Sequence, residues 1–88
     1  KKDMASKRSI KRDLNNMVFD VVDECFMAMM MNDKNNADAD KLIDEAADFQ
    51  DDMLAKINGA KSKADYKVIR EKMEEAAIDF VKKLNKMA

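Results

Sequence analysis

Apolar residues recur every three or four positions along most of this chain, which is the spacing of an amphipathic α-helix. In the first third of the chain they fall on one broad arc of a helical wheel, and they are Ile10, Leu14, Met17, Val18, Val21, Cys25, Ala28 and Met29. Ala, Leu, Met, Lys, Glu and Asp are frequent and there is no Pro, so the composition favours helix as well. The pattern predicts a first helix over about residues 4–31.

A polar stretch, NDKNNADAD at residues 32–40, interrupts this spacing. Asn and Asp favour turns and helix caps because their side chains hydrogen-bond to nearby backbone groups. We expect Asn36 or Asp38 to be the N-cap of a second helix over about residues 37–57. Its apolar side is formed by Leu42, Ile43, Ala46, Phe49, Met53, Leu54 and Ile57.

Asn58-Gly59 ends this second helix, with Gly59 suited to the left-handed conformation just past a helix. Ser62 followed by Asp65 is close to a capping box and predicts the start of a third helix, over about residues 63–87. The expected core positions of the third helix are Tyr66, Ile69 or Arg70, Met73, Ala77, Phe80, Leu84 and Met87.

The two connections are short, and a short connection makes consecutive helices antiparallel. We therefore predict an all-α fold, an up-down-up antiparallel three-helix bundle formed by residues 1–88 as a single domain. A helix exchanged between two subunits produces the same pattern. A core of this size gives only a few kcal/mol of net stability, so oligomer formation helps the chain.

The first helix has a second apolar side. Phe19, Phe26 and Met30 lie away from the predicted core, with Val22 and Met27 at their edges, and we call these five residues the outer strip. One interpretation is a wide apolar arc that contacts both other helices and leaves a stray exposed Met. The other is a docking surface for a partner, because soluble monomers rarely expose contiguous apolar patches. The simplest partner is a second copy in a dimer through the first helix, and another helical protein is the alternative.

Residues 25–32 read CFMAMMMN and raise the question of a soft-metal site. Cys25 and Met29 lie one turn apart and could bind Cu(I). Both also face the predicted core, where Cys and Met are common. The chain has one Cys and no His, so we expect core packing and neither a metal nor another cofactor.

The 17 basic and 18 acidic side chains nearly cancel, which does not favour a dedicated nucleic-acid binder. An up-down-up fold nevertheless gathers a basic end from Lys1, Lys2, Lys7, Arg8, Lys11, Arg12, Lys56, Lys61, Lys63 and Lys67. The opposite end collects Asp20, Asp23, Glu24, Asp33, Asp38, Asp40, Asp44 and Glu45. The alternative function is therefore anion or nucleic-acid binding by Lys7, Arg8, Lys11, Arg12, Lys61 and Lys63.

Other functions have little support in the sequence. The calcium-loop register that starts at Asp33 fails, since Ala37 and Asp38 occupy its fifth and sixth positions. There is no phosphate-binding loop and no nucleophile with an adjacent base, so we expect no enzyme and infer no small-molecule substrate. No apolar run approaches the roughly 20 residues that span a membrane. A lone Cys25 suits a reducing, cytoplasmic setting.

Three short stretches carry a resemblance to other proteins. KRDL at residues 11–14, DECF at 23–26 and DYKVIREKM at 65–73 resemble a group of short, all-helical bacterial proteins of unknown function. The resemblance implies a compact helical protein and supplies no catalytic residue to transfer.

Overall fold

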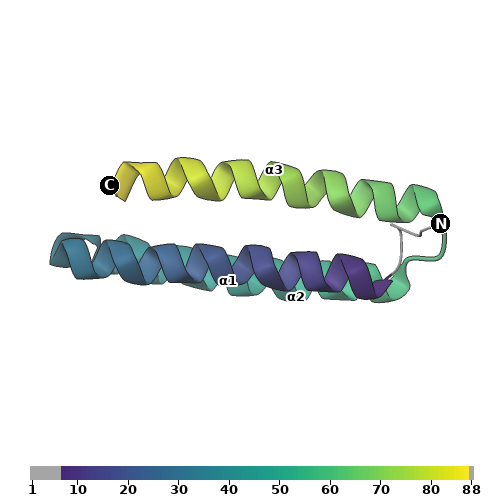
Figure 1. Ribbon diagram of the computed structural model, residues 1–88, viewed down its shortest axis with the longest axis horizontal. Helices are drawn as coiled ribbons and strands as arrows, with labels where there is room; N and C mark the ends of the chain where they lie inside the picture. The colour runs from purple at the N-terminus through teal and green to yellow at the C-terminus, as the bar shows by residue number, and fades with distance from the viewer. Residues whose placement is uncertain (1–6, 88) are drawn as a thin grey trace.

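The computed structural model describes residues 7–87, which form three long α-helices and one short 3₁₀-helix (Figure 1). These are α1 (Lys7–Met31), η1 (Asp33–Asn35), α2 (Asn36–Gly59) and α3 (Lys63–Met87). The predicted first turn of the first helix, residues 4–6, lies outside the described residues, as do Lys1 and Lys2. The all-helical, three-helix arrangement predicted from the sequence is confirmed.

Side-chain contacts fix the directions of the helices. Lys7 at the start of α1 donates from Nζ to the carbonyl oxygen of Asn58 at the end of α2, over 3.1 Å, so these two helices are antiparallel. Arg70 near the start of α3 pairs with Asp13 on α1 at 3.1 Å, so α3 runs parallel to α1. The described residues form an elongated body of 46 × 22 × 17 Å (Figure 1).

The first turn differs from the prediction of Asn36 or Asp38 as N-cap. Asn32 caps η1, its side-chain oxygen accepting from the Lys34 N–H at 3.0 Å. Asn35 then precedes α2 in a helical conformation, and its side chain donates back to the carbonyl oxygen of Ala28 at 2.9 Å instead of capping α2. The prediction was wrong because η1 leads directly into α2, with no extended residue between them.

The second turn also differs, because Gly59 is the last residue of α2 and has no positive φ. The chain leaves α2 through Ala60, which is extended at φ −70° and ψ 137° and donates its N–H to the Ile57 carbonyl oxygen at 3.1 Å. Ala60 is buried. An extended residue with a buried methyl group makes the turn, so the left-handed conformation expected of Gly59 is not needed.

The predicted cap of α3 is confirmed with one change of partner. The Asp65 N–H donates to Ser62 Oγ at 3.2 Å, as in a capping box. The Asp65 carboxylate accepts from the N–H of Lys61 at 3.0 Å, one residue before the cap. This backbone hydrogen bond, with those at Ser62, lowers the pKa of Asp65.

The core lies where all three helices meet, and every side chain that is buried within residues 7–87 is apolar. α1 and α2 pack extensively on each other, whereas α3 makes fewer contacts with either. Three buried residues hold α3 in place, namely Ile69, Met73 and Phe80. Phe80 meets Phe49 edge to face, with ring centroids 5.9 Å apart. Ile69 is the core residue, and Arg70 pairs with Asp13.

Candidate interaction surface

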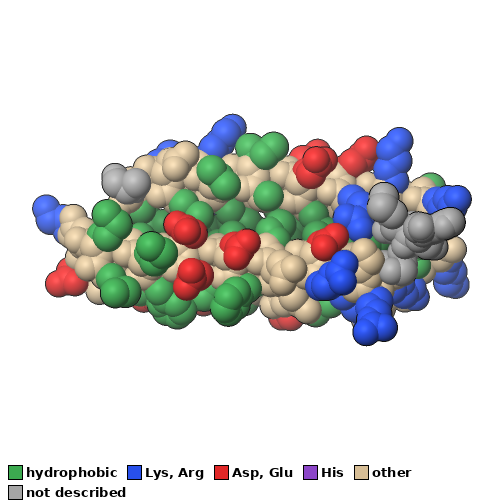
Figure 2. Space-filling view, in the orientation of Figure 1, with side chains coloured by type: hydrophobic (Ala, Val, Ile, Leu, Met, Phe, Trp, Pro, Cys, Tyr) green, Lys and Arg blue, Asp and Glu red, His purple; other side chains and the backbone are tan. Residues whose placement is uncertain are grey.

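The outer strip lies on the outside of α1. Met30 is 85% exposed, Phe19 72%, and Phe26 and Met27 51% each. Val22 is half-buried and packs against the core. Figure 2 shows hydrophobic side chains gathered along the outer edge of the α1–α2 layer, over the half of α1 nearer its C-terminus. Neither Phe19 nor Phe26 is buried beneath α2 or α3.

Contacts with the other helices show which way the strip faces. Asn15 lies on the same helical face as Phe19 and Val22, and its side-chain oxygen accepts from Gln50 of α2 at 2.7 Å. Asp13, on another face of α1, meets Arg70 of α3. Phe19 and Phe26 therefore lie toward the α2 side of α1. Met27, fourteen residues after Asp13, lies at the edge of the strip that is nearer α3.

A residue on α2 continues the strip. Residues seven apart lie on the same face of a helix, so Val22 shares the face of Asn15 on α1 and Ile43 shares the face of Gln50 on α2. Because the two helices are antiparallel, Val22 and Ile43 lie opposite each other, as Asn15 and Gln50 do. Both are half-buried and pack against the core. The seam between α1 and α2 is thus apolar beneath the strip, and Phe19 and Phe26 stand on its outer side.

Carboxylates border the strip on both sides. On α1, Asp23 follows Phe19 by four residues and precedes Met30 by seven, so it lies within the strip, whereas Asp20 precedes Met27 by seven and lies at the edge. On α2, Asp40 precedes Ile43 by three residues and lies next to it, and Asp44 follows Asp40 by four residues on the solvent-facing side. All four carboxylates are exposed, and none forms an ion pair within residues 7–87. The sequence analysis assigned Asp40 and Asp44 to the acidic end of the bundle and did not place them beside the strip.

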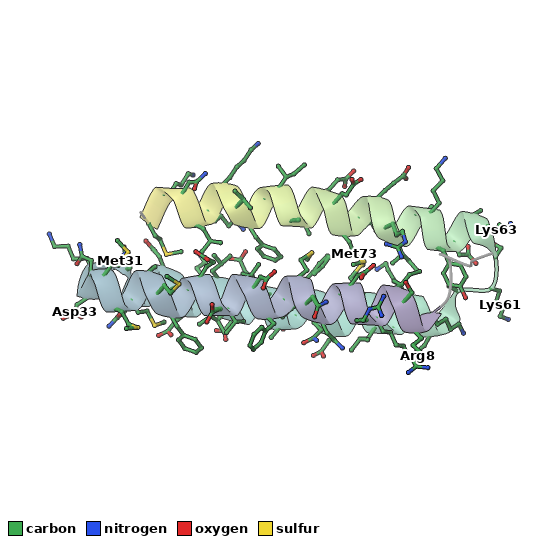
Figure 3. The ribbon with its side chains drawn as sticks, viewed as in Figure 1. Arg8, Met31, Asp33, Lys61, Lys63 and Met73 are labelled. Carbon is green, nitrogen blue, oxygen red and sulfur yellow. The ribbon has the colours of Figure 1, made fainter. Side chains whose placement is uncertain are left out.

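The basic end is present. The starts of α1 and α3 and the end of α2 lie together, and Lys61 and Lys63 lie at the α2–α3 turn (Figure 3). Arg8 points away from α3 in the same view. Arg8, Lys11 and Arg12 line a shallow hollow with Asn15 and Asn16. Among residues 7–87, no ion-pair partner faces Arg8, Lys11, Arg12, Lys61 or Lys63.

The opposite end is of mixed charge, because α3 ends there and brings lysines that the sequence analysis did not count. Lys83 pairs with Glu45 of α2 and with Asp79 at 3.2 Å. The hydrogen bond to Glu45, and to a lesser extent that to Asp79, raises the pKa of Lys83. Lys82 and Lys86 are exposed nearby. The up-down-up fold predicted from the sequence also places the end of the third helix at this end of the bundle, so these lysines could have been predicted from it.

Cys25 is fully buried in the core. Burial, and to a lesser extent the negative charge of Glu24, raises the pKa of its thiol, so the thiolate that binds soft metals or attacks electrophiles is disfavoured. Met29 is half-buried against the same core. Within the described part of the chain, no group of three or more His, Cys, Asp or Glu is placed to hold a metal ion.

Among the helices formed by residues 7–87, none combines the length and apolar character needed to cross a membrane. No model of a known protein family matches the chain, and neither a curated protein nor a solved structure matches it. The resemblance to short helical bacterial proteins stays a prediction.

Proposed function

We propose that this chain is a non-catalytic helical interaction module that self-associates through the outer strip of α1. The observation that carries the proposal is that Phe19 and Phe26 are both more than half exposed on one continuous face. Large aromatic side chains grouped in this way are typical of surfaces that a partner covers. We expect the module to act in the cytoplasm, where its single thiol stays reduced.

The wide-arc interpretation accounts for only part of the strip. Val22 packs against the core, as expected if α1 contacts two helices. Phe19, Phe26 and Met30 remain on the outside, at 72%, 51% and 85% exposure. A docking role explains why these three residues are apolar, whereas contacts of α1 with α2 and α3 do not, because neither helix buries them.

The size of the strip sets the strength of the proposed association. Its exposed side chains offer on the order of 400–500 Å² per copy, so two copies together reach roughly 1,000 Å², the lower bound for specific interfaces. Apolar burial contributes about 25 cal/mol per Å², from which the entropy of association is subtracted. We therefore expect a weak, reversible dimer, related by a two-fold axis.

The test is the molar mass in solution, measured by light scattering from about 1 μM to 1 mM, a range that brackets micromolar affinity. The wild type should approach twice the mass of one chain. The variant Phe19→Glu/Phe26→Glu should stay monomeric with an unchanged helical circular dichroism spectrum, because both residues are outside the core. Ile78→Glu is the matched control, since Ile78 is 58% exposed but lies on α3. A wild type that stays monomeric throughout contradicts self-association.

We also propose a second candidate function, anion or nucleic-acid binding at the basic end. The supporting observation is the set of cations at the start of α1 and at the α2–α3 turn whose side chains form no ion pair within residues 7–87. Uncompensated Lys and Arg at one end attract phosphates in a salt-dependent way. No aromatic residue lies among them to stack on bases, so we expect charge recognition without sequence preference.

A further inference from the structure

We infer that the outer strip is shaped for a basic amphipathic helix of another protein, whose apolar side covers Phe19 and Phe26 while its Lys or Arg residues meet the bordering carboxylates. The inference rests on the proposed function, because it assigns a partner to the same strip. It departs from self-association in the identity of the tightest partner.

The apolar part of the strip matches one face of a helix. Phe19 and Phe26 are seven residues apart and Met30 follows four residues later, which spans three turns of α1 or about 16 Å. A partner helix presents its own apolar residues at the same spacings of three, four and seven. Val22 and Ile43 at the half-buried seam give that helix an apolar floor.

The negative charges beside the strip favour a positively charged partner. On α1, Asp23 lies within the strip and Asp20 at its edge, and on α2, Asp40 and Asp44 lie on the solvent-facing side near Ile43. Each is exposed and has no cationic partner within residues 7–87. Figure 2 shows acidic side chains beside the hydrophobic ones over this half of α1. Lys or Arg residues flanking the apolar face of a partner would pair with both borders.

A second copy is a poorer match to the same borders. In a two-fold contact between strips, the carboxylates of one copy approach those of the other, and like charges brought together weaken association. Arg8 and Arg12 do not relieve this, because they belong to the other half of α1, near the opposite end of the molecule from Asp33 (Figure 3). The exposed cations that follow the strip along the chain, Lys34 and Lys41, are fewer than the four carboxylates. Self-association should therefore strengthen as salt is added, whereas binding of a basic helix should weaken.

The probe is a fluorescently labelled synthetic helix with Leu on one face and Lys on the flanks, compared with the same helix carrying Glu in place of Lys. We measure fluorescence anisotropy at several salt concentrations. The Lys helix should bind, more weakly as salt rises, and the Glu helix should bind at least about tenfold more weakly, since up to four exposed charge pairs are lost.

Variants of the chain locate the binding. Phe19→Glu/Phe26→Glu should abolish binding of the Lys helix. Asp23→Asn/Asp40→Asn/Asp44→Asn should weaken it about tenfold while strengthening self-association. The matched control, Glu71→Gln/Glu74→Gln/Glu75→Gln, removes three exposed carboxylates of α3 and should bind as the wild type does.

The outcomes separate the inference from the proposed function. Equal binding of the Lys and Glu helices, or an equal loss of binding in the two carboxylate variants, overturns the charge-selective inference. A wild type that forms dimers but binds neither helix overturns the inference and leaves self-association standing. A monomeric wild type that binds the Lys helix in the expected pattern overturns self-association and supports the inference.

Discussion

At the scale of single residues, the four phenylalanines of the chain have two different fates. Phe80 is buried and Phe49 packs against it, edge to face. Phe19 and Phe26 are more than half exposed. The same side chain therefore stabilises the fold in α2 and α3 and offers a binding surface in α1, and only the second pair is available to a partner.

Asp65 provides a test at this scale, because its carboxylate holds the Lys61 N–H at the start of α3. The hydrogen bonds lower its pKa from the ordinary value of 3.8. A group whose pKa is lower in the folded state stabilises the fold above its unfolded pKa, and the stabilisation is lost as the pH falls through the folded value. Asp65→Asn should lower the Tm at pH 7, and the difference from wild type should shrink below about pH 3.8 and vanish at more acidic pH.

Thermal unfolding followed by circular dichroism between pH 2 and pH 7 measures this difference. Asp48→Asn is a suitable control, because Asp48 is exposed in the middle of α2 and is no cap. A difference between wild type and Asp65→Asn that stays constant down to the lowest pH would contradict the assigned role.

At the scale of the helices, α3 is attached less firmly than α1 and α2 are to each other. Its exposed side carries Val68, Ile78 and Val81, each at least half exposed. Ion pairs link it to both neighbours, through Arg70 to α1 and Lys83 to α2. Exposed pairs of this kind are worth no more than about 1 kcal/mol each, so apolar contacts must supply most of the stability of this helix.

Phe80 should therefore be the most important anchor of α3. It is 4% exposed and meets Phe49 in an edge-to-face contact. We expect Phe80→Ala to lower the free energy of unfolding by about 3–5 kcal/mol, through lost burial and the cavity that remains. Chemical denaturation measures the loss, and hydrogen exchange should show reduced protection of α3 first. Val81→Ala, next to it but 54% exposed, should change stability by less than about 0.5 kcal/mol. Equal effects of the two substitutions would show that α3 is not held through Phe80.

At the scale of the whole molecule, two features lie in different places along one elongated body. The basic end is formed by the starts of α1 and α3, and the outer strip occupies the other half of α1 (Figures 2 and 3). Their separation means that an anion at the basic end and a helix on the strip could be bound together. It also means that each can be removed without the other.

The basic end is tested with a short single-stranded RNA in a gel-shift or anisotropy experiment at low salt. Wild type should bind in a steeply salt-dependent way. Arg8→Ala/Lys11→Ala/Arg12→Ala should bind much more weakly, because these residues line one hollow. The control, Lys41→Ala/Lys82→Ala/Lys86→Ala, removes three exposed lysines from the other end and should have little effect. Absence of binding by the wild type at low salt would remove this second candidate function.

Much of the fold could be predicted because helical periodicity and capping are local properties. The buried positions of α1, from Ile10 to Cys25, repeat with the period of the backbone itself. Ser62 and Asp65 are three residues apart, and their hydrogen bonds depend only on that spacing. The exposure of Phe19, Phe26 and Met30 followed from the same wheel. The sequence by itself thus determined the helices, their inner faces and the apolar part of the strip.

The tertiary structure decided the surroundings of these features. Asn35 donates from its side chain to the carbonyl oxygen of Ala28 in the preceding helix, and Ala60 makes the second turn in an extended conformation with its methyl group buried. The placement of Asp40 and Asp44 beside the strip, and of Lys83 against Glu45, depends on which neighbour lies on which side of each helix. A helical wheel gives angles about one axis, whereas the packing of three axes fixes which angles face one another, and so only packing could set the charges around the strip.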